Sequence, residues 1–200
     1  MAEVKEQPKC TPTADDFLKD EKWRAKAGNM FDALDKDKKG YVPFVFFENL
    51  IKSHETALKP EPEVALNVRK VLYEYAAALG FYPSIYQQKE EFVKNFASFM
   101  EKEVARVERG EQSLLVKRNE VMFELVSKKE NESICKEESL LLGRANGNPD
   151  CHTHSLYEQL DKENTGKLDK KMLSKLTYDL WSNLEHTEQH NDLHGILKQK

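Results

Sequence analysis

Apolar residues recur three and four positions apart along most of the chain, and glycine and proline seldom interrupt the pattern. This spacing places apolar side chains on one face of an α-helix, so the pattern predicts a mostly α-helical protein. Thr13 and Asp16 have the spacing of a capping box that opens the first helix, after a flexible polar segment at residues 1–12. Polar intervals at residues 110–113 and 144–150 predict breaks between helices.

An internal repeat is the most informative feature of the pattern. The segment Met30–Val42 aligns with Leu156–Leu168, because their apolar positions fall in register and each has an Asp, a following Lys and a later Gly. Two weaker copies of the spacing lie between them, centred on Ile85 and Ile134. The chain is therefore expected to contain four related units.

The repeated pattern is that of the EF-hand, in which the loop between two helices surrounds a Ca²⁺ ion. Acidic oxygens at loop positions 1, 3 and 5, a Gly at 6, a carbonyl at 7 and a bidentate Glu at 12 provide the turn and the ligands. The apolar residue at position 8 joins paired loops in a short ribbon. We predict an all-α fold with four EF-hand-like helix–loop–helix units in two packed halves, residues 13–108 and 114–200, each with a short antiparallel β-ribbon between its paired loops.

Candidate metal ligands remain in the first and fourth loops. In the first loop, positions 1 and 3 are Asp35 and Asp37. In the fourth loop, positions 1, 3, 5 and 9 are Asp161, Glu163, Thr165 and Asp169. Position 12 is Phe46 in the first loop and Met172 in the fourth, and neither side chain has an oxygen.

The missing carboxylate at position 12 predicts poor ion binding, because Ca²⁺ takes about six to eight oxygen ligands. Lys39, at position 5 of the first loop, adds a positive charge beside the ion's place. The third loop keeps Glu138 at position 12 but has Ser127 and Lys129 at positions 1 and 3, and the second, taken as residues 78–89, has no ligand set. We expect weak or absent Ca²⁺ binding, with the fourth loop as the best candidate.

With these units in place, the segments from Phe17 to Leu50 and from Leu156 to Trp181 resemble the sarcoplasmic calcium-binding proteins. That group includes calexcitin-like proteins and the coelenterazine-binding luciferin-binding proteins. The resemblance implies four EF-hands in two halves over the whole chain. It carries metal-binding roles only to the six residues named above in the first and fourth loops.

Some members of this wider group hold an apolar small molecule between their halves. The residues that could line such a cavity here are Phe92, Phe96, Phe99, Met100, Tyr178 and Trp181. Ordinary packing in the core is the alternative, because aromatic residues at helical spacing usually form a core.

Histidines near the end of the sequence form a further candidate metal cluster. His186, His190 and His194 share one face of a predicted helix, and a second group comprises Cys151, His152 and His154. Imidazole pairs four residues apart can hold Zn²⁺. The alternative is that these histidines form a solvated helix face. The second group also lacks a familiar zinc-binding spacing.

Composition and charge exclude several classes of function. With 31 basic and 35 acidic residues the net charge is −4, which argues against nucleic-acid binding. The longest apolar stretches, Val42–Phe47 and Tyr75–Tyr82, fall short of the roughly 20 residues of a membrane span. Three widely spaced cysteines and an N-terminus without a signal-peptide pattern predict a cytoplasmic protein.

The sequence therefore predicts a non-enzymatic EF-hand protein of the sarcoplasmic calcium-binding type with weak or lost Ca²⁺ binding. It would act as an interaction or storage module, with a protein partner in the first case. One alternative is a carrier of an apolar small molecule in a central cavity. Another is a functional calcium buffer that uses atypical ligands in the first and fourth loops.

Overall fold

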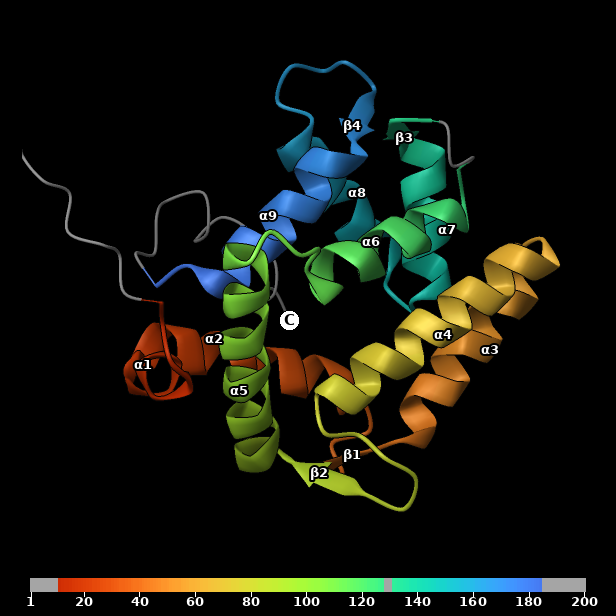
Figure 1. Cartoon of the computed structure of the whole chain (residues 1–200). Coiled ribbons are helices and arrows are strands. Elements are labelled where there is room, and N and C mark those ends of the chain that lie inside the picture. Colours follow the sequence, from red (N-terminus) through yellow and green to blue (C-terminus); the bar gives the residue numbers. More distant parts are fainter. Residues whose placement is uncertain (1–10, 128–130, 185–200) are drawn as a thin grey trace, which may run out of the picture.

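The structure, a computed structural model, describes residues 11–127 and 131–184 (Figure 1). The first half contains α1 (Ala14–Lys19), α2 (Glu21–Leu34), β1 (Tyr41–Pro43), α3 (Val45–Leu58), α4 (Pro62–Ala78), β2 (Tyr86–Gln88) and α5 (Lys89–Glu108). The second half contains α6 (Leu114–Glu124), β3 (Ser133–Cys135), α7 (Lys136–Ala145), α8 (Asp150–Leu160), β4 (Lys167–Asp169) and α9 (Lys170–Ser182). This arrangement confirms the predicted all-α fold with two ribbons.

The predicted start of the first helix is also confirmed. The Thr13 hydroxyl accepts the backbone N–H of Asp16, and the Asp16 carboxylate accepts that of Thr13 at 2.9 Å. These bonds satisfy backbone donors that the first turn of a helix leaves free. The Thr13 hydroxyl, which donates to the Asp16 carboxylate at 2.7 Å, and the Thr13 N–H together lower the pKa of Asp16.

Each half is closed by an antiparallel ribbon between its two loops, and the two ribbons lie at opposite ends of the molecule (Figure 1). In the second half Ile134 faces Leu168, which are the two residues predicted for position 8. Both side chains are buried in a small core with Phe123 and Tyr157. The apolar position thus has the predicted role, because its side chain turns inward while its backbone pairs.

The ribbon of the first half corrects the predicted centre of the second loop. Val42 faces Gln87, two residues beyond Ile85, which is 42% exposed. Gln87 is fully buried, and its amide Nε2 donates to the carbonyl of Leu79 at 2.8 Å. Gly80, with φ of +83°, makes room for it, since an added Cβ would lie 2.9 Å from this nitrogen. A buried, hydrogen-bonded polar residue stands where the repeat predicts an apolar one.

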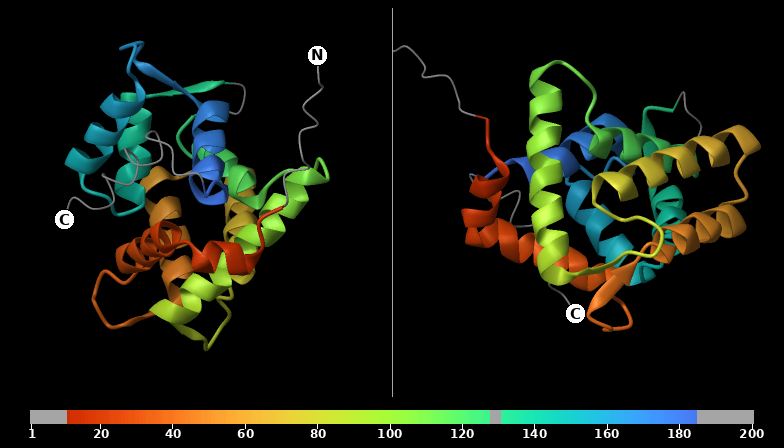
Figure 2. Two further views of the ribbon diagram at one scale, coloured as in Figure 1. Left: turned by 90° about the vertical axis from the view of Figure 1, so that its left-hand side faces the viewer. Right: turned by 60° about the horizontal axis from the view of Figure 1, so that its bottom comes forward.

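One large core spans both halves. The Phe96 ring of α5 lies 5.5 Å from that of Trp23 in α2 and 4.7 Å from that of Trp181 in α9, measured between ring centres. The helix α5 contacts α1, α2 and α9, so it joins the N-terminal helices to the last described helix (Figure 2, right). The two halves therefore pack as one body.

Hydrogen bonds hold the end of α9 against α2 inside this core. The indole N–H of Trp23 donates to the carbonyl of Trp181 at 2.9 Å, and the Lys26 ammonium donates to that of Leu180. Lys26 is 1% exposed, and burial lowers its pKa to about 8. A positive charge at the C-terminal end of a helix is favourable, which offsets part of the cost of burying this lysine.

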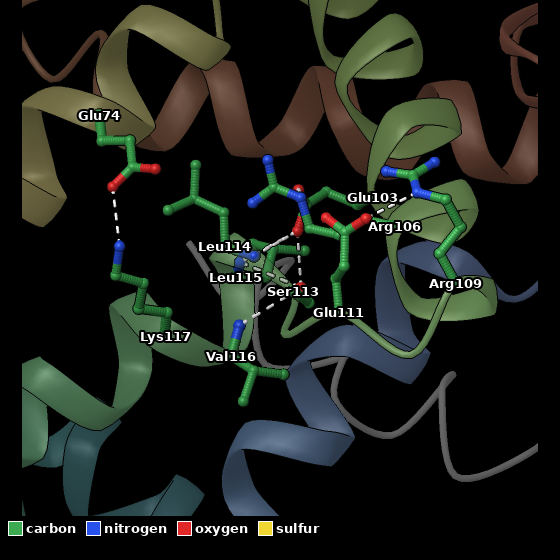
Figure 3. A network of polar contacts seen from close by, with 10 residues as sticks. All are labelled: Glu74, Glu103, Arg106, Arg109, Glu111, Ser113, Leu114, Leu115, Val116 and Lys117. Atoms are coloured by element: carbon green, nitrogen blue, oxygen red, sulfur yellow. Dashed lines mark hydrogen bonds and ion pairs between the residues drawn. The ribbon is translucent and has the colours of Figure 1, made fainter.

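Glu103 of α5 holds the start of α6, where the two halves join (Figure 3). Its carboxylate is 2% exposed and accepts the hydroxyl of Ser113 at 2.7 Å and the backbone N–H of Leu114 at 2.5 Å. Ser113 is itself the N-cap of α6. Arg106 lies 3.6 Å from the same carboxylate and balances its charge.

We expect Glu103→Gln to lower the free energy of unfolding by about 1–3 kcal/mol, because the buried N–H donors of α6 lose a charged acceptor. Urea denaturation followed by circular dichroism measures the change. Glu101→Gln removes the same charge from the same helix and should shift the midpoint little. Equal losses in the two variants would contradict a specific role for Glu103.

Candidate functional site

The first loop is held in shape by its own backbone. The carboxylate of Asp35 accepts the N–H groups of Lys39 at 2.9 Å and Gly40 at 2.8 Å. Lys38 and Gly40 have φ of 53° and 80°, which produces the sharp turn of the loop. The first candidate ligand therefore stabilises the turn within the protein itself.

Other features of this loop oppose a cation. The ammonium of Lys39 lies 2.9 Å from the carboxylate of Asp37, and this hydrogen bond and attraction raise the pKa of the lysine. Both side chains are exposed, so the ion pair contributes little to stability, but it places a positive charge on a candidate ligand. Phe46, at position 12, packs its ring against Phe47 with ring centres 5.5 Å apart.

The fourth loop repeats the geometry of the first. Asp161 accepts the N–H groups of Thr165 and Gly166, both at 2.8 Å, and the Thr165 hydroxyl at 2.9 Å. Burial opposes ionisation, but these bonds outweigh it and lower the pKa of Asp161. Asp169 is used as the N-cap of α9, since it accepts the N–H of Met172 at 2.6 Å.

The six candidate metal ligands thus form two separate groups, one in the first loop and one in the fourth. Glu163 lies exposed on the fourth loop, and Met172 at position 12 is 40% exposed. Within residues 11–127 and 131–184, no group of three or more His, Cys, Asp and Glu side chains is placed to hold a metal ion. Neither loop, as it stands, offers the full oxygen shell of a tight calcium site.

The third loop uses its position-12 carboxylate in the same local manner. Glu138 accepts the backbone N–H of Cys135 at 2.8 Å and so caps the start of α7. Asn131 donates to the Ser127 hydroxyl at 3.3 Å. Lys129 lies outside the described residues.

A cavity of about 370 Å³, partly open to solvent, lies in the second half between α6, α7, α8 and α9. Its apolar lining is Phe123, Ile134, Leu142, Leu156, Tyr157, Leu160, Leu168, Leu173, Leu176 and Leu180. The ribbon residues Ile134 and Leu168 belong to this lining, so the paired loops form one wall. Asn119, Asn146 and Thr153 add polar groups to it.

One polar group of this cavity lining lacks a partner. Tyr157 is 3% exposed, and its hydroxyl has no hydrogen-bond partner among the described residues. Burial is the main cause that raises its pKa, so the phenol stays neutral. A neutral hydroxyl can donate or accept, and a buried one without a partner costs free energy that a polar atom of a ligand can offset.

Comparisons with known proteins place this geometry in a known fold. No protein-family model matches the chain, and no curated protein matches its sequence. The structure is similar to that of the photoprotein clytin, with a TM-score of 0.77 and 19% identity over 89% of this chain and 95% of clytin. This chain has the fold of the EF-hand photoproteins.

Two further photoprotein structures support the same fold. Mitrocomin, a Ca²⁺-regulated photoprotein of the jellyfish Mitrocoma cellularia, has a TM-score of 0.78 and 16% identity over 97% of each chain. The complex of apo-aequorin with (S)-HM-daCTZ has a TM-score of 0.77 and 16% identity over 92% of this chain and 95% of that chain. The predicted EF-hand architecture is thereby confirmed, and membership of the sarcoplasmic calcium-binding group stays a prediction.

Most of the residues predicted to line a central cavity are packed in the large core instead. Five of the six predicted residues (Phe92, Phe96, Phe99, Met100 and Trp181) are in the large core, and Tyr178 is half-buried. None of the six lines the cavity between α6 and α9. Leucine is the commonest residue in the lining of that cavity, so the apolar pattern of the sequence marked these positions but indicated only a core.

The second predicted metal cluster is dispersed. Cys151 and His152 are exposed on α8, and His154 lies 3.3 Å from the carboxylate of Glu158, one turn further along the helix. His186, His190 and His194 lie outside the described residues.

Gly143 of α7 allows the closest approach between two walls of the cavity. An added Cβ would lie 2.2 Å from the Thr153 hydroxyl oxygen of α8. Gly143→Ala should lower the free energy of unfolding by about 1–3 kcal/mol, despite the better helix propensity of Ala, because α7 and α8 must separate. Urea denaturation tests this.

Thr153→Ala provides the control for this prediction, because it removes the two atoms nearest to the added Cβ. In that background Gly143→Ala should cost little or stabilise the protein. An unchanged loss would show that the contact between α7 and α8 is not the cause.

Proposed function

We propose that this chain is a non-enzymatic EF-hand protein that stores or carries an apolar small molecule in the cavity between α6, α7, α8 and α9. The cavity carries the proposal, because its volume of about 370 Å³ and its mostly apolar lining suit an organic molecule with few polar groups. The fold is compatible with this use, since apo-aequorin forms a complex with (S)-HM-daCTZ.

Ca²⁺ has a minor role in this proposal. The carboxylates of Asp35 and Asp161 are already bonded to N–H groups of their own loops. These bonds support the loop turns without an ion. The protein is then related in function to the sarcoplasmic calcium-binding group through its fold, with weak or lost Ca²⁺ binding.

The absence of catalysis and the cytoplasmic location rest on the sequence. The chain has no nucleophile in a recognised motif and no phosphate-binding glycine loop. Among the described residues, no helix is long and apolar enough to cross a membrane. Cys135 and Cys151 are free thiols.

Filling the cavity tests the carrier function. The neutral fluorescent probe N-phenyl-1-naphthylamine should bind the full chain with saturation, and Leu176→Phe and Leu156→Phe should weaken binding about tenfold, which is about 1.4 kcal/mol. Leu66→Phe is the control, because Leu66 is 66% exposed on α4. Equal binding by all variants would contradict the cavity as the binding site.

The calcium buffer is the second candidate, favoured by the intact turn of the fourth loop with Asp161, Thr165 and Gly166. Calorimetric titration of the chelator-treated full chain distinguishes it. We expect no saturable micromolar binding, because position 12 lacks a carboxylate in the first and fourth loops. Micromolar binding that Asp161→Ala abolishes would overturn this expectation and favour the buffer.

A further inference from the structure

The C-terminal end of α7 is held by side chains of the first half. The hydroxyl of Ser53 donates to the carbonyl of Ala145 at 2.9 Å, and the Lys36 ammonium donates to that of Gly147 at 3.1 Å. The Nε2 atom of His54 lies 3.0 Å from the Oδ1 atom of Asn146. Two of these bonds satisfy carbonyls at or just beyond the end of a helix, and Lys36 adds a favourable charge there.

The buried position of His54 favours a neutral ring, although Nε2 can donate to Asn146 in either protonation state. With the Asn146 oxygen facing the ring, Nε2 is the donor. The other ring nitrogen, Nδ1, is buried and has no hydrogen-bond partner among the described residues. A neutral ring leaves Nδ1 as a bare acceptor, whereas protonation creates a buried N–H donor, which is far more costly to leave unpaired.

Charged neighbours also oppose protonation of His54, which is 1% exposed. Burial is the main cause that lowers its pKa, the Asn146 bond works against this, and the positive charge of Arg118 on α6 lowers it further. Other charged groups around α3 and α7 include Lys36 of the first loop, which donates to the carbonyl of Gly147, the Glu55–Arg69 pair between α3 and α4, and the Arg144–Asp150 pair between α7 and α8. Both carboxylates in these pairs are already bound to an arginine.

Asn146 connects this contact to the cavity. Asn146, Gly143 and Leu142 lie at the end of α7 and line the cavity, so the histidine of the first half fixes a wall of the second. We propose that buried His54, bonded to Asn146, is an acid-sensitive latch that holds α7 against the cavity, and that protonation draws its ring out of this buried position, loosens α7 and releases the apolar ligand. This inference rests on the proposed carrier function.

The pH range follows from the direction of the shift. A histidine with a folded pKa below its unfolded value of about 6.5 contributes stability that is complete above pH 6.5. That contribution decreases as the pH falls through the lower folded pKa. Ligand retention should therefore be constant at neutral pH and decline in mild acid.

The test measures the affinity of the full chain for N-phenyl-1-naphthylamine from pH 7.5 to pH 5. We expect wild type to lose about tenfold in affinity, and His54→Gln to show little dependence on pH, because its amide can donate to Asn146 without titrating. His152→Gln removes the histidine that lines the cavity itself and should keep the wild-type dependence. The same acid loss in His54→Gln, or none in wild type, would overturn the latch.

A second variant gives the protonated ring of His54 a partner. Asn146→Asp places a carboxylate beside His54 that pairs with the protonated ring in the latched state, so the loss of probe binding in acid should become smaller than in wild type. An acid loss as large as that of wild type would contradict the proposal. This variant also serves if His54→Gln does not fold.

Measurements without a ligand separate the latch from the carrier function. Hydrogen exchange of residues 142–146 should rise in acid in wild type but not in His54→Gln, and the ring of His54 should titrate below pH 6.5 by NMR. Absent probe binding at pH 7.5 would overturn the carrier function, and with it ligand release. Unchanged exchange of α7 in acid would overturn the latch itself.

Discussion

The contact of Phe96 with Trp23 and Trp181 is the interaction on which the rest of the structure depends. Two helix–loop–helix units can form one half through their ribbon, but nothing in the ribbons joins the halves. The rings of α2, α5 and α9 do so, because burying large aromatic side chains is the strongest favourable term available to them. Glu103 then fixes the turn between the halves by satisfying the first N–H groups of α6.

Hydrogen bonds within the protein hold the turns of the first and fourth loops. Asp35 and Asp161 accept N–H groups four and five residues further along, which is the same arrangement in loops far apart in the chain. A carboxylate that stabilises a turn in this way has two uses in an EF-hand, as part of the turn and as a ligand. The turn bonds of Asp35 and Asp161 do not involve position 12, so a substitution there leaves the turn intact.

The two halves differ in how well their interiors are filled. The large core is dominated by side chains of the first half, including Phe17, Phe81 and Phe92, which are fully buried. The second half has a smaller core of its own and a leucine-lined cavity beside it. The half that contains this cavity is also the one whose helix α7 is held from outside by Ser53 and His54.

The sequence by itself determined the helical fold, the four units, the capping of the first helix and the pairing of Ile134 with Leu168, because these depend on local spacing. Only the tertiary structure decided that Gln87 faces Val42, since a buried amide needs the carbonyl of Leu79 to be in place. It also decided the cavity and the latch. An apolar position predicts burial but not whether neighbouring side chains fill the space. The partners His54 and Asn146 are far apart in the chain, and packing of α3 against α7 brings them together.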